Sequence, residues 1–296
     1  MDVFSPETLA EALTMKSERP DAVPIAGGTD VMVELNFDRS PACRDEHQHR
    51  RRPAALVNLN RIRELHGYSD VDGRVRVGAS MPYSRIITEL GTRLPGLAMA
   101  ARTVGSPQIR NRGSVGGNLG AASPAGDSHP ALLAADAEVE IASVRGTRMV
   151  AARDFYTGVK RNVLEPDELI AAIHLAPATG PQQFSKVGTR NAMVIAVCSF
   201  AIALHPLDRR VGTGFGSAAT TPRRAYDAED FLGVELPWGS AGPLRESLVR
   251  HFGHLVATAA SPIDDVRGTA AYRRHALSVM ARRTLGWAWD DYRRSS

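Results

Sequence analysis

The chain has 296 residues, of which 43% are hydrophobic and 23% charged, and its formal net charge is +4. This composition is ordinary for a globular protein, and the length predicts two or three domains rather than one core. Basic residues are spread along the chain without interleaved aromatic residues, so nucleic-acid binding is not expected. The two cysteines exclude an iron–sulfur cluster held by this chain alone, because such clusters normally take four cysteine ligands.

Neither a secretory signal nor a membrane span is predicted. The N-terminal segment has no basic stretch followed by an apolar one. The longest apolar run, residues 192–204, is shorter than the roughly 20 residues that a membrane-spanning helix needs. We interpret this run as a buried strand and expect a cytoplasmic protein.

Residues 1–60 predict a small α/β unit. The Ser-Pro-Glu run at 5–7 is typical of a helix start, with a capping serine, a proline at the first helical position and an acid near the positive end. The expected elements are a helix after residues 5–7, a strand over 24–26, a tight turn at 27–28, a short helix from residue 30 and a strand over 55–60.

A charged, proline-bounded loop is expected at residues 38–53. It contains Cys43, His47 and His49, whose spacing matches no standard zinc site and which lack a fourth ligand. We therefore expect a solvated loop and no metal site in this chain.

Residues 61–177 predict an α+β domain, and residues 182–290 a further domain after a Gly-Pro linker at 178–181. The middle domain is expected to have strands over 74–79, 148–158 and 167–175, helices within 81–90 and 93–104, and a helix followed by a strand over 128–143. The last domain is expected to have strands over 192–204 and 211–219 and helices over 242–258 and 270–289.

Two segments carry paired glycines, AGGTD at 26–30 and SVGGN at 114–118. Glycine lets backbone N–H groups approach a ligand closely, and several such groups together form an anion-binding concavity. Neither segment has the spacing of a P-loop or of the usual dinucleotide fingerprint. Tight turns are the simpler interpretation, but a polar residue follows each glycine pair, Thr29 and Asn118, which favours a ligand that carries phosphate.

The negative charge of Asp30 limits how the segment at 26–30 can bind a phosphate. A carboxylate would repel a diphosphate that sought the same N–H groups. We therefore expect Asp30 to cap the following helix, while Gly27, Gly28 and Thr29 offer their N–H groups to the phosphates.

The run PQIRNRGSVGGNLGAASPAGDSHPALLAADAEV at 107–139 closely resembles the FAD-binding subunit of the molybdenum hydroxylases. This family includes the medium subunit of aerobic CO dehydrogenase and the flavin domain of xanthine dehydrogenase. Four more segments agree in order along the chain: PIAGGTDVMVELN, FYTGVKRNVLEPDELIAAIHL, FSKVGTR and GTGFGSAATTPRRA. Together these motifs are specific, although no single one is.

The resemblance implies an α+β protein with a vanillyl-alcohol-oxidase (PCMH)-type FAD-binding fold. Two α/β subdomains, residues 1–60 and 61–177, would hold FAD at their junction. A C-terminal domain of sheet and helices, like that of the CO dehydrogenase flavoprotein, would span residues 182–290 and cover the flavin end.

The resemblance also implies a set of cofactor-binding residues. It places Asp127 at the flavin–ribityl region, Ile170 against the isoalloxazine and Lys186 at the polar edge of the flavin. Lys186 there could stabilise negative charge on the reduced ring. The full set is Ile25, Ala26, Gly27, Gly28, Thr29, Asp30, Ser114, Gly116, Gly117, Asn118, Ser123, Asp127, Ile170 and Lys186.

In this family a large subunit carries molybdenum on molybdopterin cytosine dinucleotide, and a small subunit carries two 2Fe–2S clusters. The resemblance implies that this chain takes electrons from those clusters and passes them to an external acceptor, within a dimer of heterotrimers. The alternatives are a stand-alone flavoenzyme of the same fold, such as an enolpyruvyl-UDP-sugar reductase, and a binding module without redox work.

Two features of the sequence distinguish this chain from some groups within the family. Relatives often carry an acid or a tyrosine shortly after the arginine that matches Arg190, whereas this chain has Asn191, Ala192, Met193 and Val194. The hydroxybenzoyl-CoA reductases hold an extra cluster in a cysteine-bearing insertion. The single cysteine of residues 38–53 excludes that variant.

Overall fold

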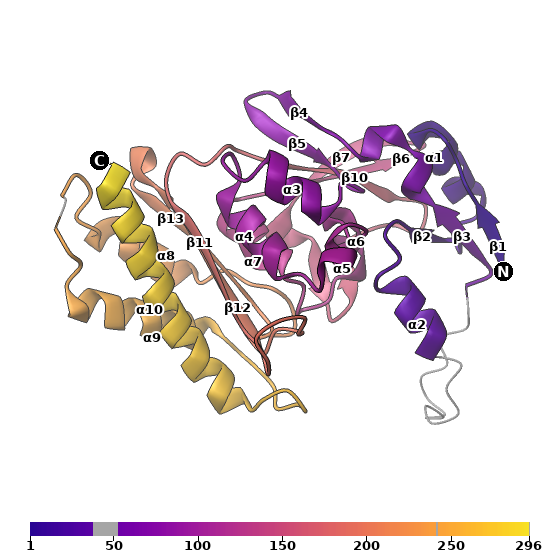
Figure 1. Ribbon diagram of the computed structural model, residues 1–296. Coiled ribbons are helices and arrows are strands. Elements are labelled where there is room, and N and C mark those ends of the chain that lie inside the picture. Colours follow the sequence, from indigo (N-terminus) through magenta and orange to yellow (C-terminus); the bar gives the residue numbers. More distant parts are fainter. Residues whose placement is uncertain (38–52, 241, 296) are drawn as a thin grey trace.

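Three larger sheets follow one another along the described part of the chain, and two short strands pair in a fourth, two-stranded sheet (Figure 1). The computed structural model describes residues 1–37, 53–240 and 242–295, so the expected loop with Cys43, His47 and His49 lies outside the described residues. The strands are β1 (Asp2–Phe4), β2 (Val23–Ile25), β3 (Ala55–Asn58), β4 (Tyr68–Val71), β5 (Arg74–Gly78), β6 (Glu138–Ser143), β7 (Gly146–Ala151), β8 (Tyr156–Gly158), β9 (Arg161–Asn162), β10 (Leu169–Leu175), β11 (Gln182–Val187), β12 (Cys198–His205) and β13 (Arg210–Gly216).

The helices cover the faces of these sheets. The α-helices are α1 (Leu9–Glu18), α2 (Val31–Phe37), α3 (Tyr83–Glu89), α4 (Pro95–Thr103), α5 (Pro107–Arg110), α6 (Val115–Ala121), α7 (Ser128–Ala134), α8 (Tyr226–Glu235), α9 (Glu246–Ala259) and α10 (Ala270–Ser295). Short 3₁₀ turns are η1 (Leu59–Arg61), η2 (Arg63–Leu65), η3 (Ala152–Asp154) and η4 (Pro206–Asp208).

The N-terminal sheet is parallel, in the order β1-β3-β2. Its helix α1 begins at Leu9 rather than directly after the Ser-Pro-Glu run, which corrects the sequence interpretation. Thr8 is the N-cap, and its side chain accepts a hydrogen bond from the N–H of Glu11 at 3.2 Å. A β-branched hydroxyl three residues before an acid has the spacing of a capping box, and this signal outweighs the earlier serine.

The middle sheet has the order β4-β5-β10-β6-β7 and is antiparallel. Its central strand β10 is buried along its whole length. Ile170 and Ile173 belong to the core under α3, α4 and α6, whereas Leu169 and Ala171 belong to the core shared with α1 and the N-terminal sheet. Burial on both faces explains why this strand is apolar at nearly every position. Side chains on the two faces of β10 therefore connect the core of the middle sheet with that of the N-terminal sheet.

The segment SVGGN, expected to be a glycine loop, is the start of helix α6. Ser114 is its N-cap and accepts from the N–H of Gly117 at 3.2 Å. Glycine at Gly116 allows a close approach, because the N–H of Gly116 donates to the carbonyl of Ala79 at 3.0 Å, and a Cβ there would lie 2.6 Å from that oxygen. Close packing, and not helix propensity, thus selects glycine at Gly116.

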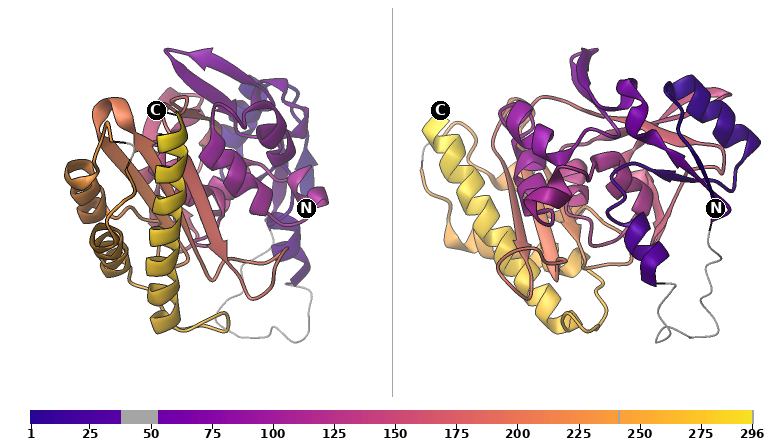
Figure 2. Two further views of the ribbon diagram at one scale, coloured as in Figure 1. Left: turned by 60° about the vertical axis from the view of Figure 1, so that its left-hand side comes forward. Right: turned by 45° about the vertical axis from the view of Figure 1, so that its right-hand side comes forward.

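The C-terminal sheet has the order β11-β12-β13 and lies between two helical layers. Helix α10 crosses its outer face beside α8 and α9, and α4 and α7 of the middle segment pack on the other face (Figures 1 and 2). Helix α8 was not predicted. Strand β12 starts at Cys198 and not at 192, and Met193 and Ile195 before it are 56% and 60% exposed.

Glycines in β13 bring the C-terminal sheet onto α7. A Cβ on Gly214 would fall well inside contact distance of the Pro130 carbonyl, and one on Gly212 would meet the Ala134 carbonyl. Small alanine side chains fill the same interface, including Ala131 and Ala201. The C-terminal sheet is therefore held to the middle segment by close backbone packing.

We expect Gly214→Ala to lower the free energy of unfolding by about 1–3 kcal/mol, because the added methyl group meets a backbone carbonyl that cannot rotate away. Urea denaturation measures this change. Gly286→Ala is the matched control, since a Cβ there meets no atom within 4 Å, and alanine in α10 should stabilise by up to about 1 kcal/mol. Equal effects of the two substitutions would contradict the packing argument.

Candidate functional site

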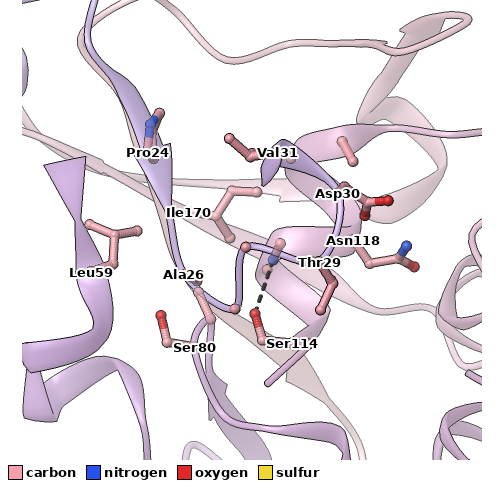
Figure 3. Close-up of a pocket in the computed structure, with 18 of the residues that line it drawn as sticks. Pro24, Ala26, Thr29, Asp30, Val31, Leu59, Ser80, Ser114, Asn118 and Ile170 are labelled. Atoms are coloured by element: carbon pink, nitrogen blue, oxygen red, sulfur yellow. Dashed lines mark hydrogen bonds between the residues drawn. The ribbon is translucent and has the colours of Figure 1, made fainter. Parts of the chain in front are cut away.

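A cavity of about 330 Å³ lies between the β2–α2 loop on one side and α6 with β10 on the other (Figure 3). Both walls come from segments that the sequence singled out. The predicted residues that line the cavity are Ala26, Gly27, Gly28, Thr29, Asp30, Ser114, Gly116, Gly117, Asn118 and Ile170. Four predicted residues, Ile25, Ser123, Asp127 and Lys186, are not part of its lining.

The β2–α2 loop presents backbone N–H groups to the cavity. Gly27 fits directly against the carbonyl of Arg112, where a Cβ would clash, and Gly28 has a positive φ of 75°. Within residues 1–37, 53–240 and 242–295, no hydrogen bond uses the N–H of Gly27, Gly28 or Thr29. Adjacent N–H groups of this kind form a concavity that suits an anion such as a diphosphate. We call residues 27–29 the cradle.

An asparagine that the sequence analysis missed holds the cradle in place. Asn60 Nδ2 donates to the Ala26 carbonyl at 2.8 Å. Asn58 Oδ1 in turn accepts from the backbone N–H and from Nδ2 of Asn60, at 3.1 and 2.7 Å. The Asn-Leu-Asn spacing at the end of β3 was the available signal, because short polar side chains after a strand commonly bond to nearby backbone.

The second glycine pair does not act as the cradle does. The N–H of Gly116 is already bonded to Ala79, and that of Gly117 to Ser114 Oγ. The expectation that both segments expose glycine amides to a ligand is therefore wrong for the second one. Figure 3 shows Ser114 and Asn118 of this segment at the cavity, where the group left to contact a ligand is the Asn118 side chain.

Charged groups surround the mouth of the cavity. Lys160 Nζ lies 2.6 Å from Glu34 Oε1, which joins the β8–β9 turn to α2, and both residues line the cavity. Partial desolvation, with Glu34 nearby, raises the pKa of Asp30, while Lys160 opposes this shift. The Asp30 carbonyl accepts from the N–H of Glu34 at 3.0 Å at the start of α2. Asp30 therefore lies directly before α2, and capping of the helix by its carboxylate stays a prediction.

Asp127 and Lys186 form a buried ion pair that is not part of the cavity lining. Lys186 Nζ lies 2.6 Å from Asp127 Oδ2 and 3.1 Å from the Thr103 carbonyl, and both side chains are less than 10% exposed. Burial raises the pKa of Asp127, although Lys186 pulls it down. Asp127 Oδ1 is buried with no hydrogen-bond partner in the described structure. The Thr103 carbonyl that Lys186 contacts belongs to the residue before Val104, which lines the cavity.

The lining can also accommodate a flat, apolar ring. Leu59, Val104, Leu164 and Ile170 supply apolar surface, and the cradle and Asn118 supply polar groups at one end. A cofactor with a ring system and a diphosphate needs both surfaces. The residues present therefore fit FAD.

Comparison with known proteins places the chain in a family. A family profile described as "FAD binding domain in molybdopterin dehydrogenase" matches residues 1–178, and one described as "CO dehydrogenase flavoprotein C-terminal domain" matches residues 183–288. The chain therefore belongs to the FAD-binding flavoproteins of the molybdopterin dehydrogenases. It is an oxidoreductase component with FAD as its cofactor, and the predicted family and fold class are confirmed.

Individual relatives resemble the chain over most of its length. It is 30% identical to the xanthine dehydrogenase FAD-binding subunit of Escherichia coli O157:H7 over 292 residues, covering 95% of this chain and 93% of that one. It is 33% identical to the nicotinate dehydrogenase FAD-subunit of Eubacterium barkeri, covering 72% and 71%. A structure of reconstituted CO dehydrogenase from Oligotropha carboxidovorans matches with a TM-score of 0.87 and 27% identity, covering 98% of each chain.

Neither a metal centre nor a membrane span is found among the described residues. No group of three or more histidine, cysteine or acidic side chains there is placed to hold a metal ion. None of the helices described is both long and apolar enough to cross a bilayer. The boundaries predicted at 60, 177 and 182 stay predictions, since hydrophobic cores extend across them.

A buried histidine in α7 predicts acid sensitivity. His129 is fully buried, its Nδ1 lies 2.8 Å from the Tyr156 hydroxyl, and burial lowers its pKa to about 3. Below the usual histidine pKa of about 6.5, His129 binds a proton in the unfolded chain but stays neutral in the folded chain. Stability should therefore be lost as the pH falls from 6.5 towards 3, by about 2 kcal/mol at pH 5.

Urea unfolding of wild type and His129→Gln at pH 7.5 and pH 5 measures this contribution. The difference between the two pH values should be smaller in His129→Gln by about 2 kcal/mol. His254→Gln, at an exposed position of α9, is the control for the substitution itself. An unchanged pH dependence in His129→Gln would show that His129 takes up its proton in the folded state.

Proposed function

We propose that this chain is the FAD-carrying medium subunit of a cytoplasmic molybdenum hydroxylase. In the proposed assembly a large subunit binds molybdenum on molybdopterin cytosine dinucleotide, and a small subunit binds two 2Fe–2S clusters, in a dimer of heterotrimers. The observation that carries the proposal is the cradle of free N–H groups beside an apolar cavity, in a chain of this family. The relatives named as FAD subunits or medium chains of multi-subunit dehydrogenases support the partners.

Each part of the site has a proposed role toward the cofactor. The N–H groups of residues 27–29 and the Thr29 hydroxyl hold the diphosphate, and Asn60 fixes the loop that carries them. Ile170 lies against the isoalloxazine, with Leu59 and Val104 nearby. When bound, FAD accepts electrons and passes them on, which is chemistry that the protein need not supply.

The Asp127–Lys186 pair is proposed to serve the polar edge of the flavin. Asp127 Oδ1 has no partner in the described structure, so it is free to accept a hydrogen bond from the ribityl chain or the ring. Lys186 is held by Asp127 Oδ2 and Thr103, and its positive charge lies in a buried environment, where it acts more strongly than in water. This arrangement would favour negative charge on the reduced ring.

Co-expression with the neighbouring dehydrogenase genes tests the assembly. We expect a yellow complex with one FAD per copy of this chain, in which reducing the iron–sulfur subunit bleaches the flavin absorbance. Turnover of a small substrate with NADPH by this chain alone would instead favour a stand-alone flavoenzyme. A colourless chain would leave only a binding module.

Gly27→Ala should abolish most flavin retention, because its methyl group would force the cradle away from the Arg112 carbonyl. We expect the affinity for FAD to fall by about tenfold or more, measured by quenching of flavin fluorescence. Gly67→Ala is the matched control, since a Cβ there meets no atom within 4 Å. Equal flavin affinity in both variants would contradict the role of the cradle.

A further inference from the structure

A chain of buried hydroxyl groups leads from the core to the Asn118 side chain. The Tyr83 hydroxyl donates to Ser128 Oγ at 3.3 Å, and the Ser128 hydroxyl donates to Asn118 Oδ1 at 2.7 Å. Tyr83 is 2% exposed and Ser128 fully buried, so neither hydroxyl can turn to water. Asn118 and Tyr83 both line the cavity, and Figure 3 shows the Asn118 side chain there.

The numbers of donors and acceptors allow only one direction for this series of hydrogen bonds, from Tyr83 through Ser128 to Asn118. Burial raises the pKa of Tyr83 well above its usual value, so the phenol keeps its proton. In the described parts of the protein, Ser128 Oγ is the acceptor that the structure provides for that proton. Ser128, having accepted it, has one proton of its own, which goes to Asn118. The reverse direction would leave the buried Tyr83 hydroxyl without an acceptor, which is unfavourable.

The same direction fixes which way the Asn118 amide points. Its oxygen faces the protein, where it is also walled in by Gly126, since a Cβ there would lie 2.8 Å from Asn118 Oδ1. The NH2 group is then on the other side of the amide. Among the described residues, no hydrogen bond uses Asn118 Nδ2 as a donor. The NH2 group is thus the donor that this cavity-lining side chain has left for a ligand.

We propose that Ser128, backed by Tyr83, is a positioning residue that holds the Asn118 amide with its NH2 group directed at an anionic oxygen of the diphosphate. This inference rests on the proposed function, because it takes FAD as the ligand. It explains how a helix start whose glycine amides are already bonded still contributes to the site. It also explains a serine and a tyrosine hydroxyl buried among apolar side chains.

A double-mutant cycle tests the proposal on the full-length chain. FAD affinity is measured by fluorescence titration for wild type, Ser128→Ala, Asn118→Ala and the double variant. Ser128→Ala frees the amide to rotate, and we expect FAD to bind about three- to tenfold more weakly. In the Asn118→Ala background, the same serine substitution should have no further effect. Tyr83→Phe should weaken binding in the same direction.

Controls separate a positioning role from a structural one. Ser199→Ala removes another fully buried hydroxyl, in β12 away from the cavity lining, and should leave FAD affinity unchanged. Unchanged affinity in Ser128→Ala, or an equal loss in the presence and absence of Asn118, would overturn the inference. Failure of FAD binding itself is distinct from both outcomes, because the wild-type chain would then bind no FAD at all. Failure of the proposed assembly is read separately, from co-purification with the partner subunits.

Discussion

The close approach of two backbone segments is the constraint on which the rest of the site depends. The β2–α2 loop lies against the carbonyl of Arg112 at Gly27, and α6 lies against the carbonyl of Ala79 at Gly116. Any side chain at either position would separate the walls of the cavity. Glycine loses more conformational freedom on folding than other residues. We propose that this loss is offset by a cradle whose free N–H groups bind the diphosphate of FAD.

The surrounding fold holds the β2–α2 loop and α6 in fixed positions relative to each other. Strand β10 is buried on both faces and therefore ties the N-terminal sheet to the middle one, and Ile170 at its start forms part of the cavity floor. On the far side, β13 and α7 pack backbone to backbone through Gly212 and Gly214. This contact brings Lys186 of β11 to Asp127 at the beginning of α7. Packing on both sides of the cofactor site thus determines where its residues lie.

Much of this could be predicted from the sequence, and the failures have physical causes. Strands with clear alternation or continuous apolar runs, such as β5 and β10, were predicted, because burial sets their pattern. The helix at SVGGN was predicted as a loop, since tertiary contact with Ala79 overrides the poor propensity of glycine. Motifs identified Asn118 and Asp127, but not Asn60 or Ser128, whose roles depend on contacts distant in sequence. Helix α8 was missed because Glu229 is a charged residue on its buried face, where it is paired with Arg224. A charge at a buried position interrupts the apolar pattern by which a helix is recognised.

The most direct test of the central claim is to compare the affinities of the chain for FAD and FMN by calorimetry. FMN has the same ring and one phosphate but lacks the diphosphate bridge to adenosine. If the cradle and Asn118 bind that diphosphate, FAD should bind more tightly than FMN by about two orders of magnitude. Equal affinity for the two flavins would show that the cradle does not hold the diphosphate and would contradict the account.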